Sequence, residues 1–201
     1  TFTGTINGNL SLYKAGPGVL TLDGYRVTSP DAGNNTFTGG VDMYGVGTVG
    51  GINIQNSTTA LGGYGGSTAG SVNLYSGTLG LLYSGNWLGV PTGNAPMYNN
   101  LTVKIGSEAG NGINVNVRGP ALINVSQAAG AGIGQSNLMQ IGDLNLTDTI
   151  LSTSGGALYR LRVAGTTTLQ GVQAGISTLS DGPSGAIEFA GVITGPGALN
   201  K

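Results

Sequence analysis

The chain has 201 residues, of which 40 are glycine and only 7% are charged, and its formal net charge is −1. It contains no histidine and no cysteine, which excludes imidazole catalysis, thiolate chemistry and Cys/His zinc sites. The few Lys and Arg residues form no basic cluster, and no apolar run is long enough for a membrane-spanning helix, so we expect no nucleic-acid partner and no membrane span in this segment.

The first forty residues carry an ordered motif of aromatic, glycine, aliphatic and lysine positions. It reads Phe-x-Gly-x-Ile-x-Gly over residues 2–8 and Leu-x-Lys-x-Gly-Pro-Gly-Val-Leu-Thr-Leu-Asp-Gly over residues 12–24. Asn-Thr-Phe-Thr-Gly-Gly follows over residues 35–40. Gly-Pro-Gly at 16–18 and the polar stretch 29–35 are turn signals between these pieces.

Short segments in which apolar and polar residues alternate follow further along the chain. They are 52–55, 113–117, 122–125, 144–147 and 158–163. This period of two predicts strands with one buried face, and regular apolar positions argue against a flexible linker. The turns that separate the strands are rich in glycine, as at 62–66, 155–156 and 181–183. Helical spacing of apolar residues is essentially absent.

Aromatic residues gather beside a proline-containing loop in the middle of the chain. Tyr83, Trp87 and Tyr98 flank the segment 90–96, which contains two prolines. Aromatic rings beside a loop form a platform for a carbohydrate or another contact, or they fasten the loop to the body of the protein. We take these three residues as a candidate binding loop and keep both interpretations open.

The last fourteen residues repeat the start of the chain. Residues 188–201 align with residues 1–14 at an offset of 187, with identical Phe, Gly, Ile, Gly, Leu and Lys positions. The strand pattern over 186–193 stops within the motif and lacks a polar cap. The alignment predicts a single unit over 1–201, with a motif at 1–40 that restarts at 188–201, as part of a longer rod or fibre.

Many short strands with turns between them predict an all-β fold, either a sandwich or barrel or a stacked solenoid. The scarcity of charge and the Asn, Ser and Thr residues beside apolar positions favour the solenoid, because stacked coils let like polar side chains bond between neighbouring coils. We therefore predict a parallel β-helix with one shared core. Coils of about 20–25 residues would give roughly eight to ten rungs.

The motif over residues 1–40 resembles the autotransporter-associated β-strand repeat. The resemblance covers 1–40 and 188–201, whereas residues 41–187 have the same composition and only loose echoes of the motif. The connection from Gly24 to Asn35 is longer than the family's usual spacing. The resemblance implies a right-handed parallel β-helix in a bacterial extracellular or cell-surface protein, and it implies no ligand.

Catalysis on a polysaccharide by a β-helix enzyme needs two or three carboxylates that converge in a groove. The eight acids form no local pair or triplet, and Asp residues in turns commonly bond the backbone. Residues 62–67 begin like a calcium-binding β-helix repeat but have Ser67 where the aspartate belongs, and the turn at Asp31 offers only a few oxygens. The sequence thus predicts no enzyme, no metal site and no cofactor.

Two classes of function remain open. The first is a structural component of a bacterial fibre, stalk or surface layer, which pairs end to end with copies of itself or with neighbouring repeats. The predicted assembly edges are Phe2, Ile6, Ile187, Phe189 and Ile193. The second is an adhesin-type module that recognises a glycan or a cell surface through the candidate binding loop. Arg160 and Arg162, which share one strand face, fit either an anionic glycan or a solvated outer face.

Overall fold

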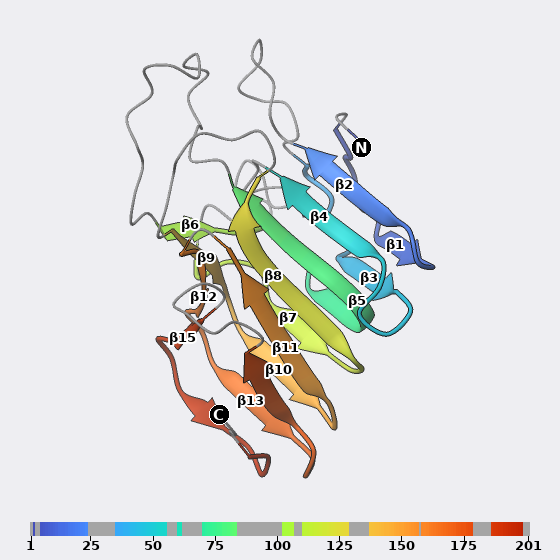
Figure 1. Cartoon of the computed structure of the whole chain (residues 1–201). Helices are drawn as coiled ribbons and strands as arrows, with labels where there is room; N and C mark the ends of the chain where they lie inside the picture. Colours follow the sequence, from blue (N-terminus) through green and yellow to red (C-terminus); the bar gives the residue numbers. More distant parts are fainter. Residues whose placement is uncertain are drawn as a thin grey trace.

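The structure is a computed structural model. It describes residues 2, 5–23, 35–55, 60–61, 70–83, 102–106, 110–128, 137–156, 158–178 and 186–198. These residues form strands and turns without a helix, and the strands pair in parallel in a curled twelve-stranded sheet and a four-stranded sheet (Figure 1). The described part of the chain thus offers no helix of the length and apolarity needed to cross a membrane. The prediction of an all-β fold built from parallel strands is confirmed.

The twelve-stranded sheet consists of two runs of strands. In spatial order, the first run is β1 (Leu12–Ala15), β3 (Val41–Tyr44), the first half of β5 (Val72–Tyr83), β7 (Val115–Val117), β10 (Leu144–Thr147), β13 (Thr167–Gln170) and β16 (Ile193–Thr194). The second run is, in the same direction, β2 (Val19–Asp23), β4 (Gly51–Gln55), the second half of β5, β8 (Ala121–Gln127), β11 (Ile150–Gly155) and β14 (Gly175–Thr178). The two runs form one sheet because the long strand β5 belongs to both, and this sheet is curled (Figure 1).

The four-stranded sheet is β6 (Thr102–Lys104), β9 (Leu138–Ile141), β12 (Arg160–Val163) and β15 (Ile187–Phe189). From β7 onward the chain visits the first run, the second run and the four-stranded sheet in this order three times and then enters β16. Paired residues of neighbouring strands are 22 to 44 positions apart in sequence, as in Leu138 with Arg160 and Thr78 with Leu122. The chain therefore adds one strand in turn to the first run, to the second run and to the four-stranded sheet.

Alternation of side chains sends one row of apolar residues from each run into a common core. Met43, Leu74, Val117 and Leu146 lie in register across the first run and are fully buried. The residues between them face outward, in agreement with the predicted period of two. Each square ångström of apolar surface removed from water contributes about 25 cal/mol, so these rows supply much of the driving force for folding.

A buried tyrosine joins the second run to the four-stranded sheet. The Tyr159 hydroxyl donates to the Tyr83 carbonyl oxygen at 2.8 Å and accepts from Asn137 Nδ2 at 3.1 Å. Burial raises the pKa of the Tyr159 phenol above its usual value, and the hydrogen bond from Asn137 acts in the opposite direction. This contact gives the buried hydroxyl its partners and holds the end of β5 against the start of β12.

The segments that lead into β10, β13 and β16 approach one another so closely that glycine is required there. Gly142, Gly165 and Gly191 each stand two residues before the first inward-facing residue of the following strand of the first run. A Cβ atom on Gly165 would lie 3.0 Å from the backbone nitrogen of Asp143, and one on Gly191 would overlap the carbonyl oxygen of Gly165. A side chain at either position would push these neighbouring segments apart.

The hydroxyl of Thr167 lies in the apolar core without a hydrogen-bond partner among the described residues. Thr167 follows Val115 and Leu144 in a core row. We expect Thr167→Val to raise the free energy of unfolding by about 1–2 kcal/mol in urea denaturation, because it removes an unpaired buried hydroxyl. Thr153→Val is the control, since Thr153 is equally buried but has an interaction partner. Equal gains from both variants would contradict this explanation.

Candidate functional site

The two ends of the strand stack carry unpaired strand edges. In the described chain β14, β15 and β16 each pair on one side only, with β11, β12 and β13 respectively. At the opposite end β1 pairs only with β3. These ends lie on opposite sides of the molecule (Figure 1). Exposed parallel edges present free N–H and C=O groups that accept a further strand.

The edge near the start of the chain contains two of the predicted assembly residues. Phe2 is 40% exposed and forms a parallel bridge to Leu22, with its N–H donating to the Thr21 carbonyl at 2.7 Å. Ile6 is half-buried and packs against the core. The lysine of the N-terminal motif also lies here, because Lys14 takes the row position of Met43 and donates to the carbonyls of Ala15 and Gly16. This edge is therefore partly polar.

At the other end, the edge strands β15 and β16 carry three of the predicted apolar residues. Ile187 and Phe189 are half-buried and pack against the core, while Ile193 is 39% exposed at the end of its core row. One strand added to β15 and another added to β16 would cover all three side chains. The structure therefore places the three predicted residues on two edge strands, one in each sheet.

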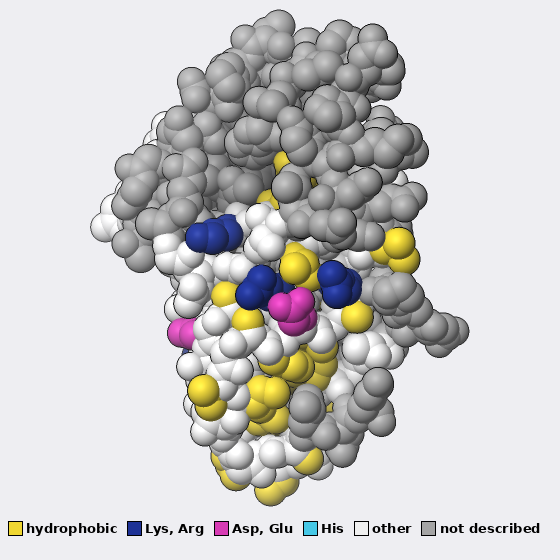
Figure 2. All heavy atoms as spheres, turned by 90° about the vertical axis from the view of Figure 1, so that its left-hand side faces the viewer, with side chains coloured by type: hydrophobic (Ala, Val, Ile, Leu, Met, Phe, Trp, Pro, Cys, Tyr) yellow, Lys and Arg dark blue, Asp and Glu magenta, His cyan; other side chains and the backbone are white. Residues whose placement is uncertain are grey.

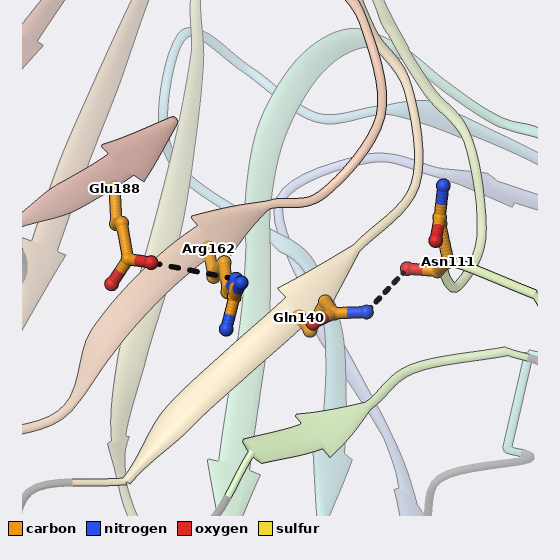
Figure 3. Close-up of polar contacts among 4 residues, drawn as sticks. All are labelled: Asn111, Gln140, Arg162 and Glu188. Carbon is orange, nitrogen blue, oxygen red and sulfur yellow. Dashed lines mark hydrogen bonds and ion pairs between the residues drawn. The ribbon is translucent and has the colours of Figure 1, made fainter. Parts of the chain in front are cut away.

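Cations gather on the outer face of the four-stranded sheet, where Lys104, Gln140, Arg162 and Glu188 lie in register (Figure 2). Arg162 Nε lies 3.4 Å from Glu188 Oε1, and Gln140 Nε2 donates to the carbonyl oxygen of Asn111 at 3.0 Å (Figure 3). Arg160 and Arg162 share this face as the sequence predicts. This ion pair is partly exposed, and its contribution to stability is small, about 0–1 kcal/mol.

A ladder of side-chain hydrogen bonds runs across the outer face of the first run. Asn145, Asn116 and Asn73 each donate Nδ2 to the Oδ1 of the preceding strand's residue, at 3.0, 2.9 and 2.7 Å, and the last acceptor is Asp42. We call these four residues the asparagine ladder. It realises the expected bonding of like polar side chains between neighbouring strands. Asp42 thus ends the ladder as an acceptor.

Three tyrosines stack beside the asparagine ladder, and we call them the tyrosine stack. The Tyr44 and Tyr75 rings are nearly parallel with centroids 4.3 Å apart, and Tyr13 packs on Tyr44 at 5.2 Å. The Arg118 guanidinium carbon lies 5.9 Å from the centroid of the Tyr75 ring. Their equal spacing of 31 residues is a signal in the sequence that would have found this stack.

Alkaline titration tests the environment of Tyr44. Desolvation, together with its contact to the Tyr75 hydroxyl, raises the pKa of Tyr44 to about 12. The folded state then holds the Tyr44 proton more tightly than the unfolded state does. The contribution of this proton to the free energy of unfolding is therefore complete below about pH 10 and is lost as the pH rises toward 12. We expect a late step in the ultraviolet titration of tyrosinate that Tyr44→Phe removes. A Tyr44→Phe titration unchanged from that of the native chain would contradict this.

The remaining predicted sites are only partly within the described chain. Tyr83 is buried in the core, and Trp87 and Tyr98 lie outside the described residues, as does Asp31. The candidate binding loop therefore stays a prediction.

Described acids serve structural contacts. Asp143 Oδ1 accepts from the backbone N–H of Thr166 at 2.8 Å, Asp42 ends the asparagine ladder, and Glu188 pairs with Arg162. The described residues contain no group of three or more acidic side chains placed to hold a metal ion. The absence of catalysis and of a metal stays a prediction.

A scan against protein-family models, a search of curated proteins and a search of solved structures each found no match to this chain. The resemblance of residues 1–40 to the autotransporter-associated repeat therefore rests on the motif alone.

Proposed function

We propose that this chain is a segment of a right-handed parallel β-helix and serves as a structural component of a bacterial extracellular fibre, stalk or surface layer. The observation that carries the proposal is the recurrence of three strands in a fixed order, each paired in parallel with its counterpart one circuit later. Right-handed crossovers are the rule between parallel strands, and the resemblance of residues 1–40 agrees with this handedness. The bacterial and extracellular setting rests on that resemblance.

Features that run across the strands support a mechanical role. The core rows, the asparagine ladder and the closely packed glycine segments before β10, β13 and β16 each connect successive strands of the same run. Such nearest-neighbour contacts make a stiff, extendable body whose stability adds up along its length. Few charges and the lack of histidine and cysteine suit a chemically inert rod, and we propose no enzymatic activity.

The open edges are the proposed contacts to the next segment or copy. A strand added to β16 would continue both the backbone ladder and the core row that ends at Ile193. When units follow one another in the same direction, β1 of one unit would lie on β16 of the other. Pairing there would bury Ile193, and a further strand on β15 would bury Ile187 and Phe189.

Sedimentation velocity over a range of concentrations tests this assembly. We expect the chain to form species larger than its mass of 19.9 kDa as concentration rises, and Ile193→Lys to remain a monomer because a lysine on an edge strand blocks pairing. Val46→Lys is the matched control, since Val46 is exposed and lies in the turn between β3 and β4. A native chain that stays monomeric throughout, or an Ile193→Lys chain that assembles equally well, would overturn the proposal.

A further inference from the structure

The outer face of the first run is a continuous polar and aromatic surface. All residues of β1, β3, β7, β10 and β13 and of the first half of β5 are described, so the strand residues of this face are placed from β1 to β13. The asparagine ladder continues in register to Thr168 on β13. The tyrosine stack and Arg118 lie beside it. Two parallel rows of recognition groups therefore cross the same strands.

We propose that this face binds an uncharged, extended polysaccharide that lies across the strands. Neighbouring strands are about 4.7–4.9 Å apart, so the amides of the ladder recur at nearly the advance of one sugar ring in a β-linked chain. Each amide has two N–H donors and two acceptor lone pairs. The ladder bonds use one donor and one lone pair of Asn73 and of Asn116, and one donor of Asn145. The groups left over are available for the hydroxyls of successive sugars.

Tyr13 supplies the apolar part of this site. Tyr13 is 65% exposed, and its ring contacts that of Tyr44 at the end of the stack. Sugar rings pack a face of C–H groups on aromatic side chains, and a ring already held by neighbours loses little entropy on binding. Tyr44 and Tyr75 have their faces against other side chains, so they offer ring edges and hydroxyls instead.

Charge selects an uncharged ligand for this face. Among its described residues, the acids Asp42 and Asp143 accept hydrogen bonds from the Asn73 amide and the Thr166 backbone N–H, and the cation Arg118 lies over the Tyr75 ring. The cations that would attract an acidic polymer are instead on the four-stranded sheet, where Lys104, Arg160 and Arg162 lie. The two faces thus differ in the ligand charge they favour.

Native affinity electrophoresis tests the proposal, with hydroxyethyl cellulose or xylan in the gel as the uncharged probe and alginate as the acidic one. We expect the uncharged probes to retard the chain. Tyr13→Ala should weaken retardation by about 2- to 10-fold, the effect of one aromatic contact. Asn145→Leu, which removes the amide at the donor end of the ladder and breaks one side-chain bond, should also weaken it.

Asn124→Ala is the matched control, because Asn124 is a half-buried asparagine of β8 on the second run. It should leave retardation unchanged, and circular dichroism should show all variants folded. The proposal is overturned if hydroxyethyl cellulose and xylan both fail to retard the chain. It is also overturned if alginate alone retards it. Equal retardation of Tyr13→Ala, Asn145→Leu and the native chain would overturn it as well.

Discussion

Gly51→Ala is expected to lower the free energy of unfolding by about 3–5 kcal/mol. Gly51 opens β4 with a φ of +151°, a backbone conformation that residues with a side chain rarely adopt. It also lies in register between Val19 of β2 and Thr78 of β5, and a Cβ atom there would overlap the Thr78 carbonyl oxygen. The methyl group therefore has no room between two paired strands. Urea denaturation followed by circular dichroism measures the loss.

Two neighbouring glycines separate the two causes of this loss. Gly16 has a φ of +79° and open space around its Cβ position, so Gly16→Ala should cost only about 1–2 kcal/mol for the left-handed backbone. Gly18 has open space and no positive φ, so Gly18→Ala should change stability by less than about 1 kcal/mol. If Gly51→Ala costs no more than Gly16→Ala, the close contact with Thr78 is not decisive.

Leu79→Ala is expected to lower the free energy of unfolding by about 2–5 kcal/mol. Leu79 is fully buried in the middle of a core row, with Ile52 on one side and Ile123 on the other. Backbone pairing on both sides keeps β4, β5 and β8 at their spacing, so the cavity cannot close by moving a strand. The same denaturation experiment measures the effect.

Leu20→Ala is the control for this cavity. Leu20 belongs to the same row but lies in β2 near its open end, where it is only half-buried. Its truncation should cost clearly less, because the site is already open to solvent. If Leu20→Ala and Leu79→Ala lower the free energy of unfolding by similar amounts, the position of a leucine along the row does not determine how much its truncation destabilises the protein.

The fold class was predictable because it depends on short-range patterns. The alternation over residues 144–147 appears in the structure as the strand β10, with Leu144 and Leu146 buried and Asn145 facing outward. Polar residues between apolar ones suggested bonding between neighbouring strands, and Asn116 and Asn145 do bond in this way. Such patterns are visible locally because strand period and burial are properties of a few consecutive residues.

The pairing partners were not predictable in the same way. Asn73 and Asn116 are neighbours in the ladder although 43 residues separate them, whereas Asn116 and Asn145 are 29 residues apart. Loops of unequal length hide such a row in the sequence. The tyrosine stack, with its equal spacing, is the exception, and the cation Lys14 at a core position is another feature that only the register reveals.

For the candidate site too, the sequence predicted some features and the tertiary structure decided others. Sequence was enough to place Ile187, Phe189 and Ile193 in strands with an apolar face, and to indicate all-β structure with little charge. The three-dimensional arrangement decided that, among the described strands, β15 and β16 each pair on one side only, and that Tyr13 and the asparagine ladder share one outer face. Local alternation sets which way a side chain points, but the lengths of the intervening turns set which strands meet.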